Sequence, residues 1–360
     1  MSGSLRSTSP LAGASPRAGG SVEVGLVLRE EDLIEWGGRL GELTAAVADA
    51  GVDHLTVGDH VSFAGGHGVD GLIKATALLA AHPWLPVQTG VYLVGLRHPA
   101  TVARALATIA LIAPGRFTFG IGVGGDDPRE LELCGVDPRT RGARTTEALT
   151  LVRRLLTGEP TTFAGRFFDV REATIRPAPA IPMPVLVGGR SGAAQTRTGL
   201  LGDGWLALWV SPERYTLGVE AIGLTAQRAG RRVPEWRHTL QLWAAFGTTH
   251  ERAVAQIAPM LERSYGLAFD RFARYTPCGP PAGVAEALAP YVAAGCQRFN
   301  IVPVAENLRA AIDAVAEVKR VLESAAPRAG ALTAPRAAAL PTARAGTLGP
   351  QREVQPADSR

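Results

Sequence analysis

The chain has 360 residues, enough for one large α/β domain or two smaller ones. Hydrophobic residues make up 46% and charged residues 19%, which indicates a folded protein with a sizeable core, yet no uninterrupted apolar stretch reaches the roughly 20 residues of a membrane helix. The net charge of +4 comes from arginine-rich ends. The rest of the chain is nearly neutral, which argues against a nucleic-acid-binding surface.

The two ends differ in composition from the rest of the chain. Residues 1–20 are rich in Ser, Gly and Pro and lack the apolar run of a secretory signal, and residues 325–360 are mostly Ala, Pro, Gly, Thr and Arg. We expect both segments to be disordered and to flank a folded region over residues 21–324. The three cysteines are scattered and odd in number, so a disulfide framework is not indicated and a cytoplasmic location is expected.

The folded region alternates short apolar strands with longer helical patterns. In chain order, strands are predicted over Val22–Leu28, Val52–Val57, Val87–Leu93, Arg116–Val123, Pro184–Val187, Gly204–Val210, Thr239–Phe246 and Arg298–Val302. Thr162–Ile175 is predicted as an insertion of extended segments. Eight strand–helix units favour a closed (β/α)8 TIM barrel, an α/β fold, over an open sheet. In such barrels the active site lies at the C-terminal ends of the strands, so the residues that follow each strand are the ones to examine.

An ionisable pair, Asp59 and His60, follows the second strand. A histidine at the mouth of a barrel can transfer a proton near neutral pH, and we expect Asp59 to orient it. In the alternative interpretation Asp59 only caps the following loop and His60 packs beneath it. A metal site built on His60 and His67 has no third ligand at a suitable spacing, so we expect no metal.

A phosphate-binding turn is predicted after the fifth strand, over Gly188, Gly189, Arg190 and Ser191. The two glycines let an anion approach the backbone, and the free N–H groups of the helix that follows can bind it. Ser191 is expected to act as the N-cap of that helix or as a direct donor, and the alternative is an ordinary tight turn.

The glycines after the fourth strand match the dinucleotide-binding pattern G-x-G-x-x-G at Gly120, Gly122 and Gly125, in a poor context. The first two lie inside the predicted strand, and Asp126 stands where a pyrophosphate would approach. Glycines such as Gly122, Gly124 and Gly125 at the end of a barrel strand more plausibly let a flat ring lie close to the backbone.

Taken in order, several segments carry a resemblance to the bacterial-luciferase-like oxidoreductase family. They are Val52–Val61, Thr89–Val91, Arg97–Pro99, Pro114–Arg116, Gly120–Gly125, Arg144, Gly188–Ser191 and Gly202–Trp205. The resemblance covers about Val22 to Val321. It implies a (β/α)8 barrel that binds FMN or the 5-deazaflavin coenzyme F420 across its mouth.

The resemblance also implies roles for particular residues. The cofactor phosphate would lie at Gly188–Ser191, a non-proline cis peptide at Gly90–Val91 would press on the ring, and Asp59 and His60 would line the reaction site. Asp126 is a candidate for a second catalytic acid, because the sequence departs from the family after the glycine run. Relatives with Asp-His at this place look more like deazaflavin users, and a homodimer is common among them.

The functional hypothesis is hydride transfer between coenzyme F420 and a small organic substrate, with His60 transferring the accompanying proton. One alternative is an FMN-dependent monooxygenase that uses oxygen, and another is a non-catalytic flavin-binding barrel. A metal-dependent hydrolase is the weakest alternative. We expect the insertion Thr162–Ile175 and the stretch Ser264–Pro281 to line or cover the pocket, because loops of this kind vary on a shared scaffold.

Overall fold

The computed structural model describes residues 22–125, 127–233 and 235–325, which belong to one compact unit. The segments predicted to be disordered, 1–20 and 325–360, lie outside the described residues except for Ala325, which ends the last helix. Asp126 also lies outside the described residues.

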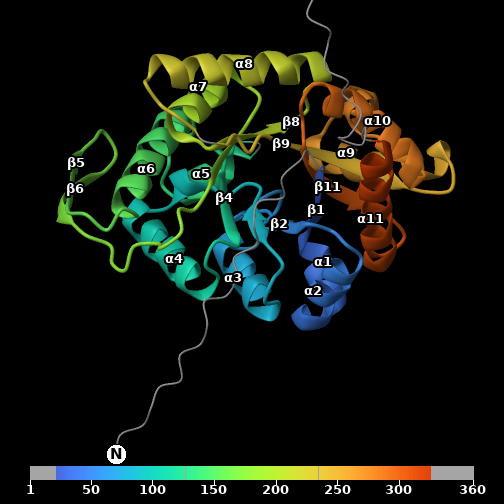
Figure 1. The fold of residues 1–360 in the computed structure, drawn as a ribbon, viewed down its shortest axis with the longest axis horizontal. Coiled ribbons are helices and arrows are strands. Elements are labelled where there is room, and N and C mark those ends of the chain that lie inside the picture. Colours follow the sequence, from blue (N-terminus) through green and yellow to red (C-terminus); the bar gives the residue numbers. More distant parts are fainter. Residues whose placement is uncertain (1–21, 126, 234, 326–360) are drawn as a thin grey trace, which may run out of the picture. The chain divides into compact units, whose positions relative to one another are not determined.

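Among the described residues, eight parallel strands close into a barrel (Figure 1). In sheet order they are β9 (Thr239–Phe246), β11 (Arg298–Val304), β1 (Glu23–Leu28), β2 (His54–Val57), β3 (Val87–Thr89), β4 (Phe117–Ile121), β7 (Val185–Gly188) and β8 (Gly204–Leu208). β8 pairs again with β9, where Leu206 lies opposite Thr239, and this pairing closes the ring. The predicted (β/α)8 fold is therefore confirmed.

Five strands, β1, β2, β3, β4 and β8, are shorter than the apolar pattern predicts, β3 and β4 by the most residues, and one strand was not predicted. β3 ends at Thr89 and β4 at Ile121, because the apolar residues beyond them line the mouth of the barrel and do not continue the ladder. The short strand β10 (Cys278–Gly279) pairs with β9 outside the ring. Two residues between turns are too few for a periodic signal.

Helices surround the strands (Figure 1). They are α1 (Glu30–Trp36), α2 (Leu40–Asp49), α3 (Gly71–Ala81), α4 (Pro99–Ile112), α5 (Pro128–Leu133), α6 (Arg141–Leu155), α7 (Gly192–Leu201), α8 (Pro212–Arg228), α9 (His250–Tyr265), α10 (Pro281–Ala293) and α11 (Leu308–Ala325). Short 3-10 helices are η1 (Val94–Leu96), η2 (Pro138–Thr140), η3 (Phe269–Arg271) and η4 (Ala273–Tyr275). The last helix, α11, illustrates the amphipathic pattern of a helix packed on a core: its apolar residues Leu308, Ile312, Val315 and Leu322 recur at helical spacing and are buried.

The predicted insertion is an antiparallel hairpin of β5 (Thr161–Ala164) and β6 (Asp169–Ala173), which lies outside the ring beside α6 (Figure 1). Its turn is held by Glu147 of α6, whose carboxylate accepts hydrogen bonds from the backbone N–H groups of residues 166, 167 and 168 at 2.7–2.9 Å. One carboxylate therefore anchors the turn to the barrel.

The barrel interior contains a buried polar layer. Asn300 of β11 is fully buried, and its Oδ1 is 2.8 Å from Nε2 of His54 and accepts a hydrogen bond of 2.7 Å from Gln88. Gly25 makes room for this layer, since a Cβ at that position would lie 2.1 Å from His54 Nε2. Burial lowers the pKa of His54, so the layer is built from neutral groups that satisfy one another.

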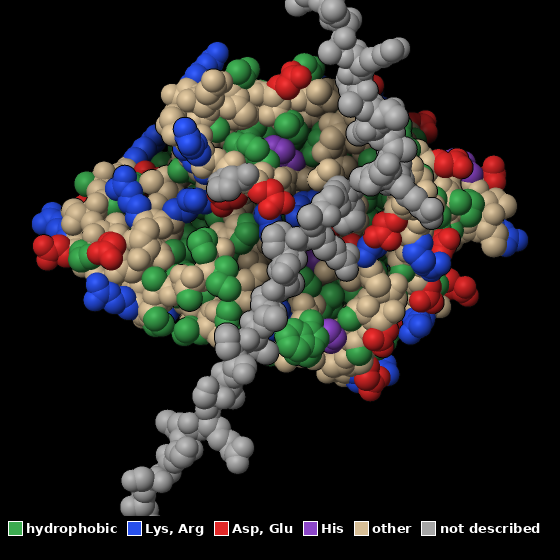
Figure 2. Space-filling view, in the orientation of Figure 1, with side chains coloured by type: hydrophobic (Ala, Val, Ile, Leu, Met, Phe, Trp, Pro, Cys, Tyr) green, Lys and Arg blue, Asp and Glu red, His purple; other side chains and the backbone are tan. Residues whose placement is uncertain are grey.

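Basic and acidic side chains are interspersed over the face drawn in Figure 2, with no continuous field of one sign over its coloured part. None of the described helices combines the length and the apolar character needed to cross a membrane. The coloured part of that face therefore shows no basic patch of the kind that binds nucleic acid.

Candidate active site

A cavity of about 990 Å³ lies at the C-terminal ends of the barrel strands. Residues that follow β2, β3 and β4 form one part of its lining: Gly58, Asp59, His60, Phe63, Gly90, Val91, Leu93, Gly122, Val123, Gly124, Gly125 and Glu130. Residues on or just after β7, β8 and β9, at the start of α8, at the end of α9 and in the segment that follows α9 form the other part: Gly188, Gly189, Arg190, Leu206, Leu208, Trp209, Arg214, Gln241, Ser264, Tyr265, Leu267, Asp270, Arg271, Phe272, Arg274 and Tyr275. Of the site residues proposed from the sequence, all the described ones except Ser191 are among them, and Asp126 lies outside the described residues.

Of the two segments expected to line or cover the pocket, one lines it and the other does not. Residues from Ser264 to Tyr275 do line it, through the end of α9 and the two short helices η3 and η4. The expectation for Thr162–Ile175 is wrong, because no described residue of that hairpin is among the lining residues. The hairpin packs instead on the outer helix α6.

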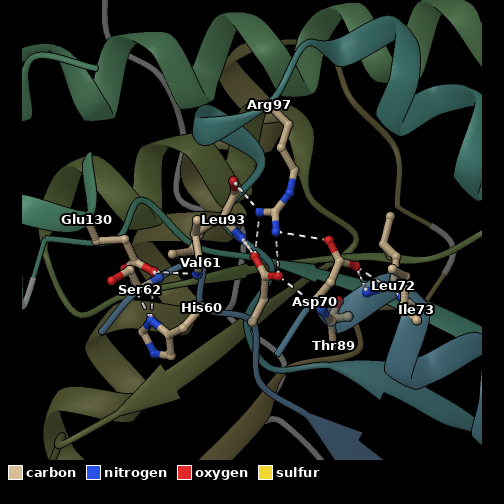
Figure 3. Close-up of polar contacts among 12 residues, drawn as sticks. His60, Val61, Ser62, Asp70, Leu72, Ile73, Thr89, Leu93, Arg97 and Glu130 are labelled. Atoms are coloured by element: carbon tan, nitrogen blue, oxygen red, sulfur yellow. Dashed lines mark hydrogen bonds and ion pairs between the residues drawn. The ribbon is translucent and has the colours of Figure 1, made fainter. Parts of the chain in front are cut away.

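Asp59 belongs to a buried cluster beside the cavity, and its partners Leu93 and Arg97 are labelled in Figure 3. Its carboxylate makes a bidentate ion pair with Arg97, at 2.7 and 2.8 Å, and accepts backbone N–H groups of Gly71 and Leu93, both at 2.9 Å. The Asp59 side chain has no exposed surface, and Arg97 also reaches Asp70, the N-cap of α3. Burial raises the pKa of Asp59, against the opposing effect of the Arg97 guanidinium. This cluster joins the chain after β2 to the chain after β3.

His60 is oriented by Glu130, and the expectation that Asp59 orients it is wrong. Nδ1 of His60 lies 3.1 and 3.2 Å from the two carboxylate oxygens of Glu130, which follows the glycine run on α5 (Figure 3). The same carboxylate accepts N–H groups of Val61 at 2.6 Å and Ser62 at 3.2 Å. The His60 ring stacks on Phe63 with centroids 4.5 Å apart.

The electrostatics of the pair follow from this geometry. The Glu130 side chain is only 3% exposed, and that of His60 is 40% exposed. Burial opposes ionisation of Glu130, but the contacts with His60 and the two N–H groups outweigh it and hold its pKa below the usual value. An ionised carboxylate on Nδ1 keeps a proton there and leaves Nε2 as the nitrogen available for proton transfer.

Three strand ends form a glycine-rich edge around Val91. The Gly90–Val91 peptide bond is cis, which confirms what the resemblance implies. A Cβ on Gly122 would lie 2.3 Å from Val91 Cγ2, and one on Gly188 would lie 2.6 Å from Val91 Cγ1. These two glycines therefore make room for the Val91 side chain. Gly125 has φ of 117°, and a Cβ there would meet Arg141 Nε at 2.7 Å.

The turn after β7 leads directly into α7. Gly189 has φ of 119°, and its carbonyl accepts a hydrogen bond of 2.5 Å from the indole of Trp205. Ser191 is the N-cap: its hydroxyl accepts the N–H of Ala194 at 3.3 Å, which confirms the capping role. Arg190 is exposed at the cavity and makes no ion pair with a described carboxylate.

Sequence reasoning missed Glu130 and gave no role to Arg97. The signal for Glu130 was an acidic residue just inside a helix that begins at Asp127–Pro128, directly after the glycine run. Arg97 stood in the run Arg97–Pro99, but its partner Asp59 is 38 residues away in the sequence. No local pattern pairs residues at that separation.

The chain belongs to the luciferase-like monooxygenase family, whose model matches residues 35–298. It is 31% identical over 222 residues to the F420-dependent glucose-6-phosphate dehydrogenase of Nakamurella multipartita, covering 60% of this chain and 66% of that protein. It is 34% identical over 167 residues to the F420-dependent hydroxymycolic acid dehydrogenase of Mycobacterium tuberculosis, covering 45% of each. The chain thus spans just under two thirds of the first of these curated relatives and less than half of the second.

Solved structures share the fold at low identity. A structure of an F420-dependent secondary alcohol dehydrogenase with an F420-acetone adduct has a TM-score of 0.73 at 20% identity, over 84% of this chain and 99% of that one. The FMN-bound oxygenating constituent of 3,6-diketocamphane monooxygenase from Pseudomonas putida has a TM-score of 0.67 at 16% identity, over 84% and 99%. Both likenesses concern the barrel.

Proposed function

We propose that this protein is an oxidoreductase that transfers a hydride between the deazaflavin coenzyme F420 and a small organic substrate. The observation that carries the proposal is the His60–Glu130 pair, which lines the same cavity as the glycine-rich strand ends. The names of the two curated relatives described above, both F420-dependent dehydrogenases, support the choice of coenzyme.

The residues of the cavity fit a flat ring with a phosphate-bearing side chain. The edge at Gly90, Val91 and Gly122 would support the ring, with Gly124 and Gly125 beside it. The phosphate would be held by Gly188, Gly189, Arg190 and the free N–H groups at the start of α7, which Ser191 caps. When bound, a deazaflavin supplies a ring carbon that accepts or releases hydride.

In this proposal the chain's own groups handle the proton and the geometry. Nε2 of His60 takes the proton from a substrate hydroxyl, or returns it, while Glu130 fixes the orientation of the ring. Asp59 acts as a positioning residue, because it ties the loop that carries His60 to the chain after Gly90. Asp126 stays a candidate for a second acid.

The second candidate is an FMN-dependent monooxygenase, favoured by the family to which the chain belongs. The experiment is to purify the protein from a host that makes both cofactors and to identify the released chromophore by absorption and mass. Deazaflavin is expected, and a bound FMN that supports oxygen-dependent turnover would end the proposal. A non-catalytic carrier would instead keep the chromophore and turn over no substrate in a broad panel of alcohols and ketones.

A metal-dependent hydrolase has little support, since no three His, Cys, Asp or Glu side chains come together as a metal site in the described part of the chain. A homodimer and a cytoplasmic location complete the proposal. The three cysteines, Cys134, Cys278 and Cys296, are free, which is typical of proteins kept in a reducing compartment.

A further inference from the structure

We infer that the substrate is an organic anion that carries an apolar, ring-sized group, with the anionic end bound by Arg271 and Arg274. The inference rests on the proposed function, because it assigns the part of the cavity that a deazaflavin would leave open. It follows from three features of the wall opposite His60: unpaired arginines, an aromatic cluster and a small adjoining cavity.

Charge is divided across the mouth of the barrel. In the closed ring β2 and β8 are four strands apart, so the loops after them face each other across the cavity. The carboxylates of Asp59 and Glu130 follow β2 and β4, and each already has a partner. Arg214, Arg271 and Arg274 follow β8 and β9 on the other side, and Arg190 follows β7, which pairs with β4. None of the four makes an ion pair with a described carboxylate.

The arginines outnumber the acids on their own side of the cavity. Asp270 is the carboxylate that lines this side, next to Arg271 in the chain. Arg190 belongs to the turn proposed for the coenzyme phosphate, which leaves Arg214, Arg271 and Arg274 for other anionic groups. A guanidinium binds carboxylate or phosphate through two parallel hydrogen bonds.

The backbone that carries Arg271 and Arg274 is anchored by Phe272, one of the two residues between them. Phe272 is 7% exposed and packs with Ala245, Ile257 and Leu261, so η3 and η4 are anchored to β9 and α9. Arg271 and Arg274 are exposed on either side of this anchor and line the cavity. The guanidinium of Arg274 lies 4.5 Å from the centre of the Tyr275 ring, which holds it against an aromatic surface.

Trp209 provides the apolar surface. It follows β8 with φ of 54°, a left-handed conformation that large side chains rarely adopt and that is concentrated at functional sites. Its ring centroid lies 5.1 Å from that of Phe272, 6.1 Å from that of Tyr265 and 6.3 Å from that of Tyr275. The unusual backbone thus turns the indole into an aromatic cluster that lines the cavity.

A second cavity of about 140 Å³ adjoins the first and shares Trp209, Gln241, Arg274 and Tyr275 with it. The rest of its lining is mostly apolar, and the Tyr291 hydroxyl there is already bonded to the Val210 carbonyl at 2.7 Å. An apolar cavity of about 150 Å³ is large enough for a benzene ring. Gln241 also donates to the Gly90 carbonyl at 3.3 Å, so the second cavity extends to the edge proposed for the coenzyme ring.

The experiment uses the full chain saturated with coenzyme F420 and three probes, 3-phenylpropanoate, its methyl ester and propanoate, in calorimetric titrations. We expect 3-phenylpropanoate to bind at least about tenfold more tightly than either of the others, because only it has both the charge and the ring. Its affinity should fall with rising salt, while that of the ester should not. No preference for 3-phenylpropanoate would overturn the inference.

Variants assign the effect to residues. The double variant Arg271→Gln/Arg274→Gln should lose the tenfold preference over the ester and retain coenzyme affinity, and Trp209→Leu should lose the preference over propanoate. Arg263→Gln, at an exposed arginine of α9 that does not line the cavity, is the matched control and should change neither preference.

Two outcomes separate this inference from the proposed function. A double variant that binds coenzyme about tenfold more weakly, with its probe preference intact, would mean that these arginines hold an acidic part of the coenzyme, and the inference would be wrong. A wild-type protein that binds no deazaflavin would contradict the proposed function itself.

Discussion

Asp59 and His60 are neighbours in the sequence, but they belong to two different regions of the molecule. In the Asp59–Arg97 cluster the Asp59 side chain is fully buried, and both of its carboxylate oxygens are bonded to fixed neighbours. The His60–Glu130 pair has one buried member and one that is 40% exposed to the cavity. Both regions pair an acid with a nitrogen base, so residue types alone do not distinguish a structural tie from a reactive group. What distinguishes the reactive group is that the His60 side chain is exposed to the cavity and has a ring nitrogen, Nε2, that Glu130 does not contact.

The largest effect is expected for His60→Ala, which removes the group proposed to transfer the proton. Turnover should fall by about 10² to 10⁴-fold, the usual contribution of a general acid or base. Coenzyme affinity and the midpoint of thermal unfolding should change little, because the ring is partly exposed. Steady-state kinetics and a coenzyme titration test this, and unchanged turnover would contradict the role of His60.

Asp59→Ala should behave in the opposite way and destabilise the fold. It leaves Arg97 partly buried without its main partner and two backbone N–H groups unsatisfied, at a cost of about 3 kcal/mol in the free energy of unfolding. Urea unfolding measures this. Asp70→Asn is the matched control, because Asp70 is 33% exposed and makes one contact with Arg97, and it should cost about 1 kcal/mol. Equal effects would remove the distinction between the two carboxylates.

The pH dependence of folding stability also has a contribution from His238, which lies outside both regions. This contribution has to be subtracted before the two regions are compared. Burial lowers the pKa of His238 to about 4, and its Nδ1 accepts the N–H of Trp205 at 3.1 Å. The unfolded chain therefore binds more protons between about pH 6.5 and 4, and stability is lost as pH falls through this range, by up to about 2 kcal/mol at pH 5. His238→Asn should flatten this part of the stability profile.

The smallest effect is expected for Glu130→Gln, which keeps an oxygen for Val61 and Ser62 but removes the charge. We expect turnover to fall about tenfold, with little change in substrate KM. Because the folded-state pKa of Glu130 is lowered, its charge stabilises the fold above its unfolded pKa of about 4.3, and this contribution is lost as pH falls through the folded value. Between pH 5 and 3 the wild type should therefore lose more stability than the variant, and equal losses would argue against an ionised Glu130.

By itself, the sequence determined the order of strands and helices, the turns at their ends and the place of His60 and the glycines at the mouth of the barrel. These follow from periodicity and from glycine and proline chemistry, which act between residues close together in the chain. Only the tertiary structure decided which partners they meet. Glu130 reaches His60 across 70 residues and Arg97 reaches Asp59 across 38, because closing the barrel brings the ends of its strands together at one mouth. The same closure left the 161–173 hairpin outside the cavity, against the sequence-based expectation, and brought the stretch with Arg271 and Arg274 into it, in agreement with the expectation.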